Sequence, residues 1–262
     1  MKQERIIFKN ADGLKLCGIL SKSDYESNIC IILCHGITVD KEEDGIFTNL
    51  AKEIVETNRF NVFRFDFRGH GESEGKSEDM TITGEKRDLE AAINLLKGRS
   101  YSRFGILAAS FAGGAVCLYC GEHPEIPKAL VLWNALIDYS SKINPVTEWG
   151  KRYWGKPAFD RVKKQGYTEI GSRKFKVGKE FMSEIKNLKP WKELKKLNIP
   201  ILFVHGDKDA HIPYGDSVKY SKMFKKGLAT IKGAEHGFHD NKEDAEEANN
   251  ATINFFYEVF EK

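Results

Sequence analysis

Residues 105–114 read Gly105-Ile106-Leu107-Ala108-Ala109-Ser110-Phe111-Ala112-Gly113-Gly114, an apolar run that passes directly into a helical pattern. A strand that turns this sharply into a helix at a serine exposes the serine hydroxyl at the end of the strand. Strand and helix approach closely at such a turn, so the residues two before and two after the serine must be small, as Ala108 and Ala112 are. Glycine is more usual at both places. The pattern predicts a nucleophilic Ser110, and the alternative is a serine that only caps the helix.

Short apolar runs like this one recur along the chain and alternate with helical patterns. We expect buried strands at Cys30–Leu33, Val62–Phe65, Gly105–Ala108, Ala129–Trp133 and Ile201–Val204, with a further strand at Leu228–Ile231. Between them, Ile46, Leu50 and Ile54 share one helical face, and the segment from Leu89 to Leu96 has another. Parallel neighbours need crossovers of this kind. The alternation therefore predicts an α/β fold, a mostly parallel sheet with helices on both faces.

The two ends of the chain add details to this fold. Near the start, strand candidates at Ile6–Lys9 and Leu14–Leu20 flank Asp12-Gly13, a strong hairpin signal, so the sheet is expected to begin antiparallel. The last helix is expected to begin at an Asp240 N-cap, because Glu243 follows three residues later.

One segment breaks the alternation of strands and helices. From about residue 138 to residue 191 there is no buried-strand run, but there are many aromatic residues and a hairpin-like segment, Tyr167–Phe175, around Gly171. Residues 141–192 hold 14 Lys or Arg against 5 Asp or Glu, so this segment carries +9 and the rest of the chain −6. We interpret residues 1–262 as a single domain with a cap insertion above the sheet at about 138–191.

Composition narrows the class of protein only moderately. A formal charge of +3 argues neither for a nucleic-acid partner nor for an acidic, solvating chain. The odd number of cysteines, several of them in apolar strand-like runs, favours free thiols and a reducing compartment. The N-terminus lacks the apolar core of a signal peptide, and no apolar run is long enough to span a membrane. A cytoplasmic protein is the expectation, and the sequence leaves a homodimer open.

Two further polar residues follow later strand candidates. Asp207 and Asp209 come after Ile201–Val204, and His236 comes after Leu228–Ile231. In open α/β sheets these strand ends meet at the edge where sites form. A serine hydroxyl is a poor nucleophile, so a histidine must take its proton and a carboxylate must orient that histidine. The order Ser110, Asp209, His236 predicts such a triad, with Asp207 as the rival for the acid.

With Ser110, Asp209 and His236 in this order, the chain resembles the α/β-hydrolase superfamily. Within that superfamily it resembles the capped bacterial esterases that include cinnamoyl and feruloyl esterases. The similarity covers nearly the whole length. Two further segments carry it: Phe65-Asp66-Phe67-Arg68-Gly69-His70-Gly71-Glu72-Ser73, which is similar to the family's DxRGHGxS turn, and Leu33-Cys34-His35-Gly36-Ile37, which is similar to its HG loop. The resemblance implies that His70 is structural. It also implies an oxyanion hole made by the backbone N–H groups of Ile37 and Phe111.

The other histidines and the cysteine pair have simpler interpretations. We expect His35 to brace its loop, and His123, His205, His211 and His239 to be surface or loop residues outside the site. Cys117 and Cys120 form a CxxC spacing, but it lies inside a helical pattern with no second pair. We therefore predict no metal and no cofactor.

The predicted function is a serine esterase that cleaves a carboxylic ester through an acyl-enzyme, with a small or aromatic acyl group as the resemblance implies. The partner is then a small-molecule ester, with no nucleic acid involved. The alternatives are an acyl-CoA thioesterase, a monoacylglycerol lipase and, from another class, a non-catalytic binding protein of the same fold. The basic insertion is either a solvated face or a surface that attracts an anionic substrate. Its aromatic residues, among them Trp149, Trp154, Phe175 and Phe181, either line an acyl pocket or form its own core.

Overall fold

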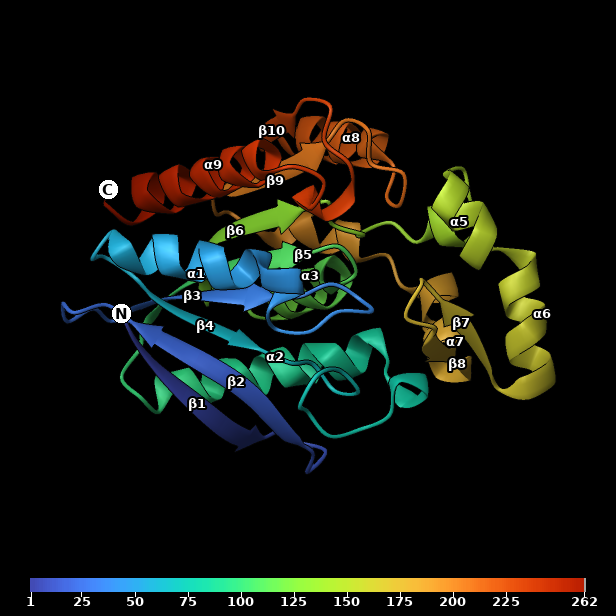
Figure 1. The fold of residues 1–262 in the computed structure, drawn as a ribbon, viewed down its shortest axis with the longest axis horizontal. Helices are drawn as coiled ribbons and strands as arrows, with labels where there is room; N and C mark the ends of the chain where they lie inside the picture. The colour runs from blue at the N-terminus through green and yellow to red at the C-terminus, as the bar shows by residue number, and fades with distance from the viewer. Residues whose placement is uncertain (262) are drawn as a thin grey trace.

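A computed structural model describes residues 1–261 and contains a central eight-stranded sheet with helices on both faces (Figure 1). The strand order is β1-β2-β4-β3-β5-β6-β9-β10. The strands are β1 (Lys2–Lys9), β2 (Lys15–Lys22), β3 (Ile29–Cys34), β4 (Asn61–Phe65), β5 (Arg103–Ala109), β6 (Pro127–Trp133), β9 (Ile201–Gly206) and β10 (Gly227–Ile231). The pairs β1/β2 and β2/β4 are antiparallel and the remaining neighbours are parallel. The predicted α/β fold is confirmed, including its antiparallel start.

Strand order determines where a site can form. The chain moves from β3 outward to β4 and then returns to the other side of β3 to form β5. The connections that leave β3 and β5 therefore run in opposite directions, toward β4 and β6, which opens a crevice outside the carboxyl ends of β3 and β5. The segments that begin at His35 and Ser110 follow these two strands directly.

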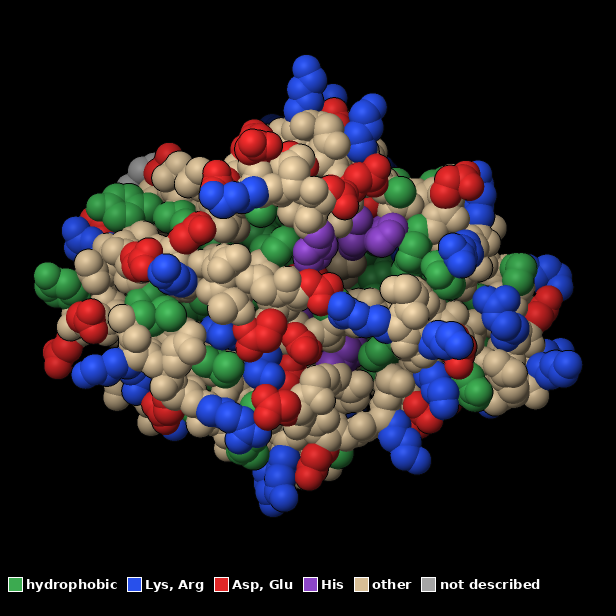
Figure 2. Space-filling model, in the orientation of Figure 1, with side chains coloured by type: hydrophobic (Ala, Val, Ile, Leu, Met, Phe, Trp, Pro, Cys, Tyr) green, Lys and Arg blue, Asp and Glu red, His purple; other side chains and the backbone are tan. Residues whose placement is uncertain are grey.

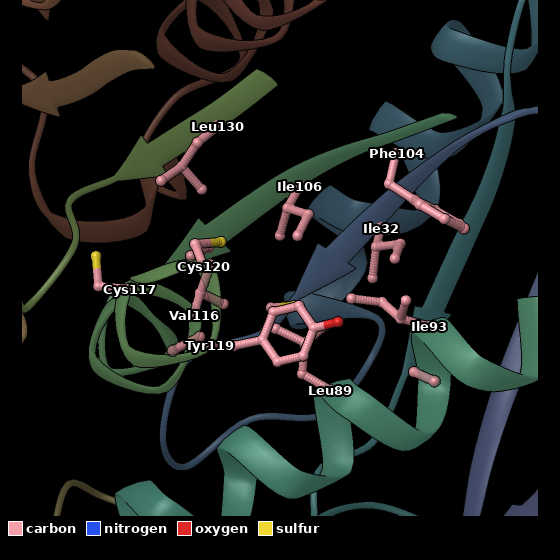
Figure 3. Close-up of a cluster of buried hydrophobic side chains, with 14 of the residues drawn as sticks. Ile32, Leu89, Ile93, Phe104, Ile106, Val116, Cys117, Tyr119, Cys120 and Leu130 are labelled. Atoms are coloured by element: carbon pink, nitrogen blue, oxygen red, sulfur yellow. The ribbon is translucent and has the colours of Figure 1, made fainter. Parts of the chain in front are cut away.

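Two apolar layers enclose the sheet. The helices α1 (Ile46–Glu56) and α9 (Lys242–Phe260) pack with Ile31 and Leu33 on one face. The other face carries α2 (Ile82–Lys97), α3 (Ala112–Glu122) and α8 (Tyr214–Phe224). Figure 3 shows part of this second layer, where Leu89 and Ile93 of α2 and Val116 of α3 lie with Ile32 and Ile106 of the sheet. Alternate residues of one strand enter opposite layers, as expected for strands buried on both faces.

The cysteines and the start of the last helix test two smaller predictions. Within residues 1–261, all five cysteines are buried and none forms a disulfide. Cys117 and Cys120 of α3 belong to the apolar layer that α2 and α3 form on the sheet (Figure 3). The predicted Asp240 N-cap of α9 is wrong by one residue. Asn241 is the N-cap, and its side-chain oxygen accepts the Asp244 N–H at 2.7 Å. Both residue types can cap a helix, so the tertiary path of the chain decides between neighbours.

Except for its last part, a 3-10 helix that packs on α3, the segment between β6 and β9 lies beyond the ends toward which the parallel strands point (Figure 1). Its elements are α4 (Ser140–Ile143), α5 (Glu148–Tyr153), α6 (Lys156–Gln165), β7 (Tyr167–Ile170), β8 (Phe175–Gly178), α7 (Lys179–Asn187) and the 3-10 helix η3 (Pro190–Lys196). The predicted hairpin around Gly171 is confirmed as β7/β8. Trp154 and Phe181 are fully buried in a third apolar cluster, which also contains Ile37 and Phe111. This segment therefore packs directly on the loops that follow β3 and β5.

Three further 3-10 helices are η1 (Glu43–Gly45), η2 (Ser77–Asp79) and η4 (His236–Phe238). Among residues 1–261, no helix combines the length and the apolar character needed to cross a bilayer.

The turn after β4 is held by a buried ion-pair network. The Arg68 Nε and Nη2 donate to the two carboxylate oxygens of Asp88 at 2.9 and 2.7 Å, and Nη2 also donates to Asp12 at 2.8 Å. Asn10 donates to the same carboxylate at 2.6 Å. Asp88 is fully buried, so its charge depends on these partners.

Replacing Arg68 with methionine is expected to lower the free energy of unfolding by about 3–5 kcal/mol, because Asp88 would then be a buried charge without its cation. The matched control is Arg87→Met, since Arg87 pairs with Asp12 at a half-exposed position and should cost about 1 kcal/mol or less. Urea unfolding of both variants measures the difference. Equal losses would show that the buried pair is not what holds this turn.

Candidate active site

Ser110 occupies a strained turn between β5 and α3. Its φ of 49° is a left-handed value that a residue with a side chain seldom adopts. Backbone hydrogen bonds hold this conformation: the Ser110 N–H donates to the Trp133 carbonyl at 2.9 Å, and the Leu136 N–H donates to the Ser110 carbonyl at 2.7 Å. Ala108 and Ala112 are both buried where strand and helix meet. The turn thereby directs the Ser110 hydroxyl away from the sheet edge and into a pocket.

The structure brings the three predicted triad residues together. His236 Nε2 lies 3.1 Å from Ser110 Oγ, and His236 Nδ1 lies 2.7 Å from Asp209 Oδ2. Since an ionised carboxylate only accepts, the assigned tautomer has Nδ1–H donating to Asp209 and Nε2 accepting from the Ser110 hydroxyl. In this arrangement the imidazole can take the serine proton while the carboxylate stabilises the imidazolium.

Asp209 is surrounded by donors. Its Oδ1 accepts the His211 and Ile212 N–H groups at 2.7 and 2.8 Å, and its Oδ2 lies 3.1 Å from His205 Nε2 as well as close to His236. Burial alone would raise the pKa of Asp209, but the positive charge of His236 and the hydrogen bonds from His205 and His236 hold it well below its usual range. The carboxylate therefore stays ionised across the pH range in which proteins usually work.

Asp207, the rival acid, has a different place. Its Oδ1 accepts the Gly233 N–H at 2.7 Å, which ties the loop after β9 to the loop after β10. The partner of His236 is Asp209.

The predictions for the remaining histidines are partly wrong. His35 braces its loop as predicted, because its Nδ1 lies 2.7 Å from the Gly36 carbonyl and its Nε2 accepts the Phe67 N–H at 3.0 Å. His123 is a half-buried residue at the end of α3. His205, predicted on a surface or loop, is instead fully buried at the end of β9 and contacts Asp209. The interior position of β9 buries it, and its place four residues before the acid was the available signal.

His211 and His239 were also predicted to lie outside the site, and the structure contradicts this. Both line the pocket next to His236, and the rings of His211 and His236 are 4.6 Å apart. The short loops after β9 and β10 converge at the sheet edge, so polar residues near the triad in sequence are near it in space. Burial lowers the pKa of His211 to about 4, so this ring is neutral near pH 7.

Lys142 supports the same wall of the pocket from α4. It is fully buried, and its Nζ donates to the His211 carbonyl at 2.8 Å. The ammonium also lies 5.2 Å from the ring centre of Trp149 and 5.8 Å from that of Phe111. Burial lowers the pKa of Lys142 to about 7. Nothing in the sequence of the insertion distinguishes this lysine from its exposed neighbours.

The predicted oxyanion donors flank the serine. Ile37 follows β3 and Phe111 follows the serine itself, and both line the pocket. Among residues 1–261, neither backbone N–H donates to another protein group. The adjacent Gly36 N–H is different, because it donates to Glu43 Oε2 at 2.7 Å. Two free N–H groups beside a nucleophile can bind the oxygen of a tetrahedral intermediate.

The pocket has a volume of about 180 Å³ and contains the Ser110 and His236 side chains. Aromatic and aliphatic walls come from Phe111, Trp149 and Ile212. Histidines gather around a hollow near the centre of the face in Figure 2, with acidic side chains beside it and many basic ones over the insertion. The pocket lining within residues 1–261 includes no lysine or arginine.

A second polar cluster, apart from the pocket, contains side chains of types that can bind a metal ion. Cys17, Asp66 and Glu72 have potential ligand atoms within 4.8 Å of one another. The Lys41 Nζ lies 2.9 Å from both carboxylates and supplies the positive charge there. The cluster therefore functions as an ion-pair network in this structure.

Comparisons with known proteins show the family to which the chain belongs. A model of the family described as serine aminopeptidase, S33, matches residues 26–165, which is more than half of the chain. Protein YqkD of Bacillus subtilis (strain 168) is 25% identical over 245 residues, covering 91% of this chain and 73% of that protein. Human serine hydrolase BPHL is 25% identical over 204 residues, covering 72% of this chain and 66% of that protein.

Among solved structures, Est1E from Butyrivibrio proteoclasticus with ferulic acid bound has a similar fold. The TM-score is 0.83 with 23% identity, and the match covers 98% of this chain and 100% of that one. An esterase domain from a Rhodothermus marinus protein gives a TM-score of 0.73 with 21% identity, covering 97% of this chain and 98% of that one. At this identity the likeness establishes the fold.

Proposed function

Because the chain belongs to the α/β-hydrolase family described as serine aminopeptidase, S33, we propose that this hydrolase is a serine esterase that works through an acyl-enzyme. The observation that carries the proposal is the position of His236, within hydrogen-bonding distance of both Ser110 Oγ and Asp209 Oδ2. Acyl transfer by a serine requires a base within hydrogen-bonding distance of the serine hydroxyl and an acid that orients this base.

The reaction follows from these positions. Ser110 Oγ attacks the ester carbonyl carbon while His236 Nε2 takes the hydroxyl proton, and the resulting oxyanion accepts the Ile37 and Phe111 N–H groups. Collapse of the intermediate breaks the ester C–O bond, and His236 returns the proton to the leaving alcohol. A water molecule then attacks the acyl-serine with His236 again as base, which releases the carboxylic acid and restores Ser110.

The shape of the pocket supports a small or aromatic acyl group. Its volume of about 180 Å³ is below the range typical of sites for drug-sized ligands, so a long acyl chain does not fit into this pocket. Phe111 and Trp149 offer aromatic surfaces for a planar acyl group. The ferulic acid bound to Est1E, a protein of the same fold, supports an aromatic acid in this position.

The insertion between β6 and β9 is proposed to serve as a cap over this pocket within a single domain. Trp149 of α5 and Gly171 and Ser172 of the β7/β8 turn belong to the pocket lining. We also propose that the protein works in a reducing compartment such as the cytoplasm. The five unpaired cysteines support this, because proteins of oxidising compartments commonly use their cysteines in disulfides.

Turnover of a substrate panel tests the proposed function. The panel contains short-chain nitrophenyl esters, methyl ferulate, a long-chain monoacylglycerol, an acyl-CoA and an aminoacyl nitroanilide. We expect kcat/KM for the short and aromatic esters to exceed that for the long-chain substrates by about 100-fold or more, because the small pocket cannot bury a long chain. Preference for the nitroanilide would instead indicate a peptidase, and preference for acyl-CoA a thioesterase. No turnover of any member would favour a binding protein.

A further inference from the structure

Glu43 places a carboxyl group beside the nucleophile, and the proposed reaction does not use it. The side chain is 7% exposed and lines the same pocket as Ser110. Its Oε2 accepts the Gly36 N–H at 2.7 Å. Its other oxygen, Oε1, has no hydrogen-bond partner among residues 1–261. This oxygen is open to the pocket, so its charge acts on whatever the pocket binds.

Glu43 and the nucleophile face the same small space. A Cβ atom added to Gly36 would lie 3.3 Å from Glu43 Oε1 and 3.6 Å from Ser110 Oγ. Glu43 Oε1 and Ser110 Oγ therefore lie within about 7 Å of one another, on the two sides of that point beside Gly36.

The backbone around Glu43 is strained in a way that turns this side chain inward. Glu43 and Asp44 both have left-handed φ values, 47° and 54°. Such values are rare for residues with a side chain and are retained where the surrounding structure fixes them, often at functional sites. The neighbouring Asp44 carboxylate is already paired with Arg173 from the β7/β8 turn.

The charged groups around Glu43 set its protonation. Burial raises the pKa of Glu43 to about 7, although the Gly36 N–H and the positive charge of His236 act in the opposite direction. Asp44 and Asp40 raise it further. Arg173 is the cation facing this group from the insertion, and it is engaged by Asp44. Glu43 is therefore mostly neutral below about pH 7 and mostly ionised above it.

From this geometry we propose that Glu43 is a specificity-determining residue that makes the pocket reject anionic esters in favour of neutral ones. The inference rests on the proposed esterase function. It reverses the idea that the basic insertion attracts an anionic substrate, because none of the insertion's lysines or arginines belongs to the pocket lining described. Lys163 and Lys164, for example, are exposed at the far end of α6.

Two pairs of matched esters test this. One pair carries the variable group on the acyl side, as nitrophenyl sulfopropanoate and nitrophenyl methylsulfonylpropanoate. The other carries it on the alcohol side, as the sulfopropyl and methylsulfonylpropyl esters of acetic acid. A sulfonate stays anionic at every pH used, and the sulfone has a similar size without the charge. The ratio of neutral to anionic kcat/KM cancels the titration of His236, because both members of a pair use the same triad.

For at least one pair, we expect this ratio in the wild type to rise about 10- to 100-fold between about pH 5.5 and about pH 8.5, the size expected for two charges several ångströms apart near a protein surface. The midpoint should lie near the Glu43 pKa of about 7, because kcat/KM reports the free enzyme. In Glu43→Gln, which keeps an oxygen to accept the Gly36 N–H, the step in this ratio should shrink to the smaller part that comes from Lys142. Burial lowers the pKa of Lys142 to about 7, and its ammonium lies behind the pocket wall, so Lys142→Met measures that part separately. Asp44→Asn is the matched control, because Asp44 is the neighbouring carboxylate in the pocket lining. It should retain the step with its midpoint moved to lower pH, since Asp44 raises the pKa of Glu43.

The outcomes separate this inference from the proposed function. A wild-type ratio that is flat for both pairs overturns the role of Glu43 even if the neutral esters are hydrolysed well, and it needs no variant to fold. A step of undiminished size in Glu43→Gln also overturns it. If wild-type protein hydrolyses no neutral ester, the esterase function itself fails.

Discussion

Replacing Ser110 with alanine is expected to lower kcat for ester hydrolysis by about a million-fold, to the level left by the oxyanion hole and substrate binding alone. Nucleophile, base and acid act as a unit, so loss of the nucleophile removes the benefit of all three. His236 would still be oriented by Asp209 but would have no hydroxyl proton to take. Steady-state hydrolysis of the best ester in the panel measures the loss.

The fold should survive this change. The Ser110 turn is held by its backbone N–H and carbonyl, and alanine retains both groups. Circular dichroism and urea unfolding of the variant provide the control, because a destabilised protein would lose activity for an unrelated reason. A folded Ser110→Ala variant with activity within about tenfold of wild type would show that Ser110 is not the nucleophile.

Asp209→Asn is expected to lower kcat by about ten-thousand-fold. The asparagine oxygen can still accept the His211 and Ile212 N–H groups, so the loop should keep its shape. Its amide nitrogen would then face His236 and donate to Nδ1. That bond favours the tautomer with the proton on Nε2, which cannot accept the Ser110 proton.

Asp207→Asn is the matched control for this prediction. Asparagine keeps an oxygen to accept the Gly233 N–H, so we expect a loss of about tenfold or less. The kcat values of the two folded variants, measured on the same ester, give the comparison. The opposite ranking would show that Asp207 supports the reaction and that Asp209 only shapes the loop.

Much of this fold was predictable because the short apolar runs in the sequence coincide with the buried strands of the sheet. The run Cys30–Leu33 corresponds to β3, Ile29–Cys34, and Gly105–Ala108 to β5, Arg103–Ala109. The strands extend beyond the apolar runs because hydrogen-bonding to neighbours continues past the last apolar side chain. Small residues around Ser110 and the order of the polar residues were enough to predict which side chains meet.

Glu43 could not be predicted in the same way. It lies in Asp40-Lys41-Glu42-Glu43-Asp44, a sequence that is typical of a solvated loop. Only the left-handed turn at Glu43 and Asp44 directs one of these carboxylates inward. Likewise, His205 is buried because β9 lies between β6 and β10 and not at the edge of the sheet, which depends on strand order. Tertiary contacts determine the positions of both side chains. The order of polar and apolar residues along the chain therefore does not predict them.

The claim that Ser110 is an activated nucleophile can be tested directly by labelling. The folded protein is treated with a fluorophosphonate, which phosphonylates activated serines, and the adduct is located by peptide mass mapping. We predict one adduct per chain, on the peptide that contains Ser110, formed in parallel with loss of esterase activity and absent from Ser110→Ala. Active wild-type protein that remains unlabelled at Ser110, or that loses activity through an adduct on another residue, would contradict the proposed mechanism.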